Sequence, residues 1–318
     1  MDFQKKIVEQ TDENIRLDKW FFRHYPHISN TLIQKQIRQK DILLNDKKTA
    51  ANVRLQEGDI IEFPVFEEKP VSKRKISAEE IRLMQDMVIY KDNWVIAINK
   101  PAGLAVQGGS KTTRHIDGML EALQFEKKEK PVLVHRLDKD TSGVLLLERD
   151  KNTAAKLAKS FATRQAHKKY WALVYGVPKE KEGKIDAPLI KKSGASGGEQ
   201  VYVDKENGQS AKTLYRVVDH LDNKAAWLEL SPLTGRTHQL RVHCLSMHTP
   251  IIGDSKYHEN NHLGFLSCEN KLHLHAREIQ MPHPVKGMLA ICAKMPHYMK
   301  KSFSELGFDE KTIDERGE

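Results

Sequence analysis

Short, uninterrupted apolar runs most constrain how this chain can fold. Residues 94–98, 144–147 and 170–175 form such runs, and each is short enough for a strand buried inside a sheet. Further elements are expected as strands at 213–218, 226–230, 272–277 and 288–293, and as helices at 152–162, 237–248 and before Gly307. The charged, glycine-containing stretch 178–210 predicts hairpins and loops. Because strands and helices do not alternate regularly, the chain predicts an α+β fold.

The first 66 residues predict a small separate unit. Leu17, Trp20 and Phe21 stand at i, i+3 and i+4, as in the apolar stripe of a short helix, and Ser29 can cap a second helix. Short strands are expected at 42–44 and 60–63. Three apolar residues of the second helix are expected to face a core: Leu32, Ile33 and Ile37. Three basic residues are expected on its solvent side: Lys35, Arg38 and Lys40.

A polar stretch separates this unit from the rest of the chain. Residues 66–80 read FEEKPVSKRKISAEE, a charged composition with one proline that is typical of a linker. We therefore expect a linker over residues 67–85 and a main domain over residues 86–318.

The charge balance points to a polyanionic partner. The chain of 318 residues has 52 Lys and Arg against 43 Asp and Glu, a formal net charge of +9. Basic surfaces bind phosphate through counterion release, although an ordinary basic soluble protein fits the charge equally well. No stretch approaches eighteen consecutive apolar residues, the N-terminus has no secretion signal, and the three cysteines form no CxxC pair. We expect a cytoplasmic protein without a membrane span.

Chemistry-bearing residues concentrate between two predicted strands. Residues 134–143 bring together His135, Arg136, Asp138 and Asp140, and Gly143 is expected to turn the chain there. Loops held by rigid strands collect catalytic groups, but an ordinary polar connection has a similar composition. The residues alone leave both interpretations open.

The stretch HRLDKDTSG at residues 135–143 resembles the signature HRLDxxTSG of the RluA-type family of pseudouridine synthases, and every specified position matches. NKPAG at 99–103, HKKY at 167–170 and LTGRTHQLR at 233–241 resemble further family elements in the same order. The resemblance covers about residues 90–295. It implies a mixed, largely antiparallel sheet with a central cleft and the conversion of uridine to pseudouridine in structured RNA.

The N-terminal unit, residues 1–66, is similar to an S4 domain, a small α/β RNA-binding fold. Arg16-Leu17-Asp18 and residues 40–46 carry this likeness, with Lys40 where a glycine is usual. Members with such a domain act on large-subunit ribosomal RNA, so that RNA is the expected substrate and partner. Transfer RNA remains the alternative substrate.

The reaction breaks the uracil N1–C1′ bond, turns the base and rejoins it through C5. The resemblance implies that Asp138 is the nucleophile, whereas the motif does not specify the position of Asp140. It implies that Arg236 pairs with Asp138 and keeps it ionised in a pocket that excludes water. Tyr170 corresponds to the tyrosine that stacks on the base and assists proton removal from C5, although a core aromatic would look the same. The covalent bond could form at C1′ or at C6.

The remaining site residues are expected to bind the substrate. Leu240 corresponds to the apolar lining of the base pocket, and Arg136 is expected to contact the RNA backbone or the space that the base leaves. The other expected RNA contacts are His135, Lys168 and Lys169 in the main domain and Lys35, Arg38 and Lys40 in the N-terminal unit.

No metal or cofactor is expected. His238 with His243, and His273 with His275, lack further ligands at fixed spacing, and no P-loop or GxGxxG is present. Most of the 15 histidines are expected at the surface or facing RNA. A catalytically silent RNA-binding or assembly factor remains an alternative, as does, more remotely, a metal-dependent hydrolase. The presence of Asp138 and Arg236 favours an enzyme, expected as a monomer.

Overall fold

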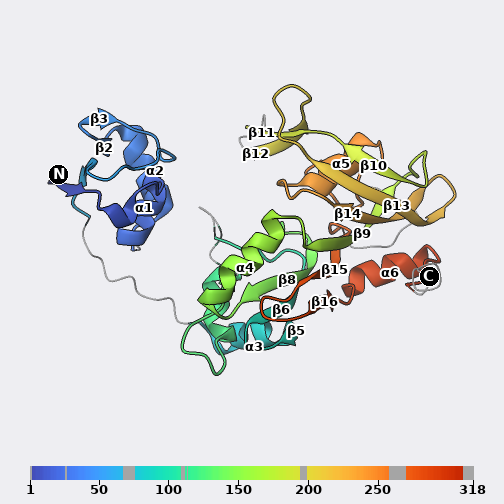
Figure 1. Cartoon of the computed structure of the whole chain (residues 1–318). Helices are drawn as coiled ribbons and strands as arrows, with labels where there is room; N and C mark the ends of the chain where they lie inside the picture. The colour runs from blue at the N-terminus through green and yellow to red at the C-terminus, as the bar shows by residue number, and fades with distance from the viewer. Residues whose placement is uncertain are drawn as a thin grey trace. The chain divides into compact units, whose positions relative to one another are not determined.

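A computed structural model describes residues 2–25, 27–66, 76–108, 112, 114–193, 199–257 and 270–310 (Figure 1). The chain divides into two compact units, Met1–Lys75 and Ile76–Glu318. No helix in the described part of the chain combines the length and apolarity needed to cross a membrane.

The N-terminal unit packs two helices against a small sheet. Helices α1 (Leu17–His24) and α2 (Asn30–Gln39) follow a short 3₁₀ turn, η1 (Gln10–Asp12). The four antiparallel strands lie in the order β1 (Phe3–Ile7), β4 (Ile60–Pro64), β2 (Leu43–Leu44) and β3 (Lys47–Lys48). The two predicted helices are confirmed, whereas β1 was not predicted from the polar run FQKKI.

Helix α2 begins where its sequence predicts. The Ser29 hydroxyl accepts the Leu32 N–H at 3.2 Å, which confirms the N-cap. Ile33 is buried, but Leu32 is 36% exposed, so its assignment to the core was wrong: it lies one position off the buried face. The helix ends at Lys40 with φ +68°, a left-handed conformation that glycine adopts most easily. Three basic side chains are exposed as predicted: Lys35, Arg38 and Lys40.

The predicted linker extends too far. Ser77 and Glu80 form a capping box, in which each side chain bonds the other's backbone N–H, and helix α3 (Ala78–Asp86) follows. The S-x-x-E spacing in the sequence marks this helix start, which the charged composition concealed. The rest of the predicted linker, residues 67–75, lies outside the described residues.

The second unit is built on one ten-stranded sheet. Its strands lie in the order β10-β13-β14-β9-β15-β8-β6-β5, with β16 paired to β15 and β7 paired to β8. All these pairs are antiparallel except the parallel pair β8–β15, which confirms the mixed, largely antiparallel sheet. The strand bounds are β5 Val88–Lys91, β6 Val95–Lys100, β7 Val132–Leu133, β8 Ser142–Glu148, β9 His167–Tyr175, β10 Glu182–Asp186, β13 Lys212–Leu221, β14 Ala225–Pro232, β15 Leu274–Pro282 and β16 Met288–Cys292. A separate hairpin joins β11 (Leu189–Ser193) and β12 (Glu199–Val203).

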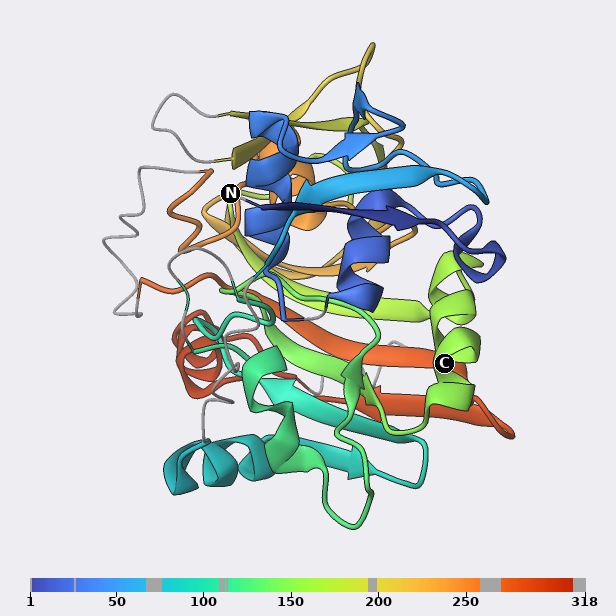
Figure 2. The same ribbon diagram turned by 90° about the vertical axis from the view of Figure 1, so that its left-hand side faces the viewer.

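Helices cover both faces of this sheet, which explains the uninterrupted apolar strands (Figure 2). In the half with β6 and β8, α4 (Lys151–Ala162) packs on one face, and α3 with η2 (Asp117–Leu123) packs on the other. In the half with β9 and β14, α5 (Gln239–Ser246) and α6 (His297–Glu305) take opposite faces. The strands predicted from apolar runs are therefore confirmed as the buried centre of the unit.

The two halves meet at the parallel pair β8–β15, where Gly143 lies beside Ala276. Gly143 has φ +111°, and a Cβ there would lie 2.2 Å from the Ala276 carbonyl oxygen. Its predicted role in a tight turn was wrong: the missing side chain lets two strands approach. This junction sets the start of β8 directly after the Asp138 loop.

Candidate active site

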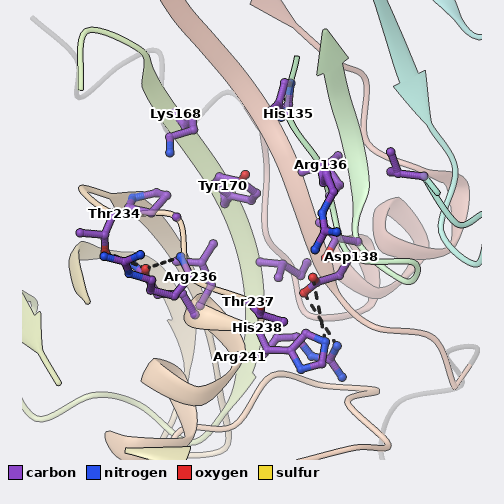
Figure 3. Close-up of a pocket in the computed structure, with 18 of the residues that line it drawn as sticks. His135, Arg136, Asp138, Lys168, Tyr170, Thr234, Arg236, Thr237, His238 and Arg241 are labelled. Atoms are coloured by element: carbon purple, nitrogen blue, oxygen red, sulfur yellow. Dashed lines mark hydrogen bonds and ion pairs between the residues drawn. The ribbon is translucent and has the colours of Figure 1, made fainter. Parts of the chain in front are cut away.

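A cavity of about 1670 Å³ opens in the second unit around the Asp138 loop (Figure 3). Its walls come from the loop before β8, the first half of β9, the turn after β14 and the start of α5. The cavity agrees with the central cleft that the sequence predicts, and it exceeds the size of a typical small-ligand pocket.

Asp138 lies on a loop that is held in place by hydrogen bonds. Its carbonyl oxygen accepts the Thr141 N–H at 3.2 Å, which turns the loop into β8. Beneath it, the fully buried Lys100 donates from Nζ to three backbone carbonyl oxygens at 2.8–2.9 Å: those of Pro101, Leu104 and Lys139. All three donors of the ammonium group are used, so this lysine ties the loop at residue 139 to the turn after β6.

The guanidinium that faces Asp138 belongs to Arg241 on α5. Its Nη1 lies 3.9 Å from Asp138 Oδ2. Two bonds to the buried Asp254 hold this guanidinium in place, from Nε to Oδ2 at 2.8 Å and from Nη2 to Oδ1 at 2.6 Å. Such a two-pronged pair fixes the orientation of an arginine. Arg241 is therefore presented to Asp138 as a rigid cation.

Arg236 does not make this contact, which corrects the assignment made from the sequence. It is exposed, its Nε donates to the Ser210 carbonyl oxygen at 3.2 Å, and Figure 3 shows it across the cavity from Asp138. Gln239 Oε1 accepts its backbone N–H at 3.0 Å, so Arg236 belongs to the turn before α5 and not to the helix face behind Asp138.

The charges around Asp138 oppose its desolvation. The side chain is 26% exposed, and burial raises the pKa of Asp138, while the charges of Arg241, Lys100 and Arg136 pull it back down. Burial likewise lowers the pKa of Lys100 to about 7, against the charges of Asp140 and Asp138. The guanidinium groups of Arg241 and Arg136 thus favour the ionised form of Asp138, which is the form that reacts.

A second group faces the other oxygen of this carboxylate. His238 Nε2 lies 4.0 Å from Asp138 Oδ1, and its Nδ1 lies 2.7 Å from the Tyr257 hydroxyl. Burial, followed by the charge of Arg241, lowers the pKa of His238 to about 4, so the ring is neutral at neutral pH.

Tyr170 and Leu240 lie on the cavity wall as predicted. Tyr170 comes from β9, where it pairs with Ala276 and Leu230. Burial and the charge of Asp138 raise the pKa of its hydroxyl, so Tyr170 stays protonated near Asp138. Leu240 is almost fully buried in the first turn of α5 and packs in the cluster under Tyr170.

The predicted RNA contacts differ in the partners that their side chains have within the protein. Arg136 is exposed on the cavity wall and donates to the Gln107 side chain at 3.3 Å, and Lys168 also lines the cavity. Lys169 lies between two carboxylates, 3.9 Å from each of Glu229 and Glu278. Lys169 also lines the cavity, so its contact with an RNA phosphate stays a prediction.

His135 has a structural environment. Its Nε2 accepts the Leu146 N–H at 2.9 Å and so satisfies a strand donor of β8. The ring stacks on Phe161 of α4 with 4.8 Å between the ring centres, and burial, followed by the charge of Lys168, lowers its pKa to about 3. His135 therefore braces the wall of the cavity that it also lines, and its contact with the substrate stays a prediction.

The other histidine predictions were partly wrong. His243, His273 and His275 are fully buried and bonded: to Thr213 and Ala187, to Ser302, and to Ser142, respectively. Within the described ranges, no group of three or more His, Cys, Asp or Glu side chains could hold a metal ion. Lys35, Arg38 and Lys40 belong to the N-terminal unit, and their contact with RNA stays a prediction.

Sequence reasoning missed four residues around Asp138: Lys100, His238, Arg241 and Asp254. A signal existed for two of them, because His238 and Arg241 are three apart at the start of a predicted helix and so share one face. Asp254 joins from a loop distant in sequence, and no local pattern indicates it.

Comparison with known proteins identifies the family. A model of the RNA pseudouridylate synthase family matches residues 94–246. Ribosomal large subunit pseudouridine synthase C of Rickettsia typhi is 36% identical over 294 residues, which cover 90% of this chain and 95% of that protein. RNA pseudouridine synthase 4, mitochondrial, of Arabidopsis thaliana is 35% identical and covers 83% of this chain and 70% of its own length.

A solved structure agrees with these sequence matches. The human RNA Pseudouridylate Synthase Domain Containing 4 superposes with a TM-score of 0.61 and 31% identity, over 73% of this chain and 98% of that one. Together with the HRLDKDTSG loop in its cavity, these matches establish that the chain belongs to the RluA-type family of RNA pseudouridine synthases.

Proposed function

We propose that this enzyme isomerises specific uridines of large-subunit ribosomal RNA, with Asp138 as the nucleophile. One observation carries the catalytic part: Asp138 stands in an open cavity with the rigidly held guanidinium of Arg241 3.9 Å from its oxygen. The substrate part rests on relatives named for the large ribosomal subunit, which this chain matches over nearly their whole length.

The chemistry needs a carboxylate and no cofactor. Ionised Asp138 forms a transient covalent bond, either with C1′ as the uracil anion leaves or with C6 of the base. The N1–C1′ bond breaks, the base turns, C5 bonds to C1′, and the bond to Asp138 breaks so that the carboxylate is regenerated. A proton leaves C5 and N1 gains one, so the product has the composition of the substrate.

The target base has to leave its stack to reach Asp138, which costs a few kcal/mol. Tyr170 and Leu240 offer an aromatic and an aliphatic surface for the flipped base. Arg136 and Lys168, which line the same cavity, supply positive charge for the neighbouring phosphates or for the vacated space.

Replacing Tyr170 with Phe is expected to slow isomerisation on the order of 10²-fold, the lower range for a lost acid–base group, with RNA affinity unchanged. The ring would still stack, but the hydroxyl beside Asp138 would be gone. Single-turnover rates and filter-binding affinities measure the two effects separately. Full activity in the variant would leave Tyr170 with stacking alone.

Deleting residues 1–66 is expected to weaken RNA binding and to flatten its dependence on salt. We assign RNA docking to the S4-like N-terminal unit because Lys35, Arg38 and Lys40 are exposed on and directly after α2. Each lost phosphate contact should lower the slope of log affinity against log salt by roughly 0.7–0.9. A Gln substitution at all three positions is the matched variant, and an unchanged slope in both proteins would refute the docking role.

The substrate is tested by mapping with carbodiimide, which marks pseudouridine as a stop in primer extension. Large-subunit ribosomal RNA and transfer RNA from cells lacking this protein are each incubated with the purified enzyme. New stops confined to the large-subunit RNA support the proposal, whereas stops confined to transfer RNA move the activity there. No stops in either RNA would favour the silent binding factor.

A further inference from the structure

We infer that His238 is a positioning residue for Asp138: held by Tyr257, it directs an Nε2–H at Oδ1 while Arg241 holds Oδ2. The inference rests on the proposed role of Asp138 and adds how its carboxylate is oriented. Figure 3 shows His238 and Arg241 side by side under the carboxylate, each joined to it by a dashed line.

Geometry gives the carboxylate two distinct partners. His238 Nε2 lies 4.0 Å from Oδ1, and Arg241 Nη1 lies 3.9 Å from Oδ2. Both distances exceed a hydrogen bond in this free protein, and such catalytic contacts commonly tighten only when substrate binds. Once both contacts tighten, one donor on each oxygen restricts rotation about the Asp138 side chain and sets the plane of the carboxylate relative to the base.

The contacts of Tyr257 favour one tautomer of His238, with the proton on Nε2. The Tyr257 hydroxyl oxygen accepts the Val201 N–H at 3.1 Å and lies 2.7 Å from His238 Nδ1. When the hydroxyl donates its proton to Nδ1, both the donor and the acceptor of the hydroxyl have a partner. Nε2 must then carry the hydrogen of the neutral ring. The opposite tautomer would point a nitrogen lone pair at the Asp138 carboxylate.

The surrounding charges keep this ring neutral. Burial, followed by the charges of three cations, lowers the pKa of His238 to about 4: Arg241, Lys256 and Lys191. The carboxylate of Asp254 acts in the opposite direction. A neutral donor restrains Asp138 without transferring a proton to it, so the carboxylate remains the nucleophile.

The backbone supports this placement. His238 is the N-cap of α5, with φ +52° in the left-handed region. Side chains with a Cβ adopt this conformation reluctantly, although histidine does so more readily than most. Gln239 anchors the same turn to β13 through the Lys212 carbonyl and the Thr213 hydroxyl, both at 3.0 Å, so the imidazole is delivered by a fixed backbone.

The test compares His238→Leu with His238→Gln in the full-length enzyme. Leucine removes the donor, whereas glutamine presents an N–H at a similar reach. With large-subunit ribosomal RNA from cells lacking this protein as the probe, His238→Leu should lower the single-turnover rate on the order of 10- to 100-fold, the range for a hydrogen bond to a charged group, with KM unchanged. His238→Gln should recover most of the rate.

The pH dependence of the single-turnover rate on its acid side, the acid limb, provides a second readout. A purely structural role of His238 would not shift it. The charged groups that act on Asp138 include Lys100, Arg136, Arg241 and Asp254, and neither variant replaces any of them. Loss of a donor to the charged form should shift the acid limb to higher pH in His238→Leu, and His238→Gln should return it. A raised KM with an unchanged rate would instead make His238 an RNA contact and overturn the inference.

Tyr257→Phe tests the tautomer independently of activity. In the intact protein, nitrogen NMR of labelled imidazole at neutral pH should find His238 neutral with its proton on Nε2, and Tyr257→Phe should weaken this preference. A proton on Nδ1 in the intact protein would refute the inference. Asp138→Asn distinguishes failure of the proposed nucleophile from failure of the role of His238. Activity in Asp138→Asn would refute Asp138 as the nucleophile. An inactive Asp138→Asn together with a fully active His238→Leu would refute only the role of His238.

Discussion

Asp138→Asn is expected to abolish pseudouridine formation, with a loss of at least ~10⁴-fold, because an amide cannot form the covalent bond that the reaction needs. The side chain keeps its size, so RNA binding should stay within about threefold, the range of a surface-like change of under 1 kcal/mol. Single-turnover formation of pseudouridine and filter-binding affinity measure the two quantities. Activity above this level would contradict the assignment of the nucleophile.

Asp140→Asn is the matched control, two residues along the same loop. Asp140 is exposed, so its replacement should leave the chemical step within about threefold of the wild type. If Asp140→Asn were the inactive variant, the family motif would have been aligned to the wrong carboxylate.

The raised pKa of Asp138 also predicts the sign of the change in stability in Asp138→Asn. Burial raises the pKa of Asp138, so the folded chain binds this proton more tightly than the unfolded chain does. Above the ordinary pKa of the group, its ionised form therefore lowers stability, and Asp138→Asn should melt no lower than the wild type. The activity of the wild type should fall as the pH drops through a pKa above the ordinary 3.8, because the protonated acid does not attack.

The main sheet could be predicted because its strands are buried on both faces. Residues 144–147 and 170–175 read as apolar runs since helices cover each side of β8 and β9, so burial alone reveals them. Strand β1 could not be found in this way, because most of its FQKKI side chains are exposed and its stability comes from pairing with β4. Gly143 shows the same limit, since its constraint is a carbonyl on β15, more than a hundred residues away.

The residues of the site also differ in whether local sequence or tertiary structure reveals them. The loop with Asp138 is contiguous and could be recognised from its sequence, whereas its charge partner depends on where α5 begins. Arg236 and Arg241 are five residues apart, and only the helix start after His238 turns the second of them toward Asp138. Asp254 comes from a loop after α5 and fixes Arg241 through tertiary contacts that no spacing records.

Arg241→Met is expected to lower both stability and activity. Without the guanidinium, the carboxylate of Asp254, 1% exposed, stays buried beside Asp138, a loss of roughly 3–5 kcal/mol in unfolding free energy for a broken buried pair. The chemical step should slow on the order of 10²- to 10³-fold, as when a fixed electrostatic partner is removed from a reacting site, and the acid limb should move to higher pH. Denaturant unfolding and single-turnover rates against pH measure these effects.

Arg236→Met tests whether Asp138 pairs with Arg241, as in the structure, or with Arg236, as the family motif suggested. Arg236 is exposed and bonded to the Ser210 carbonyl, so its loss should cost under about 1 kcal/mol and leave the acid limb in place. Arg241→Lys should fall between the two methionine variants, because an ammonium keeps the charge near Asp138 but not the two-pronged pair with Asp254. A displaced acid limb in Arg236→Met with a normal one in Arg241→Met would mean that the RNA-bound enzyme exchanges the two arginines. The pairing at Asp138 would then be set by substrate and not by the fold of the free chain.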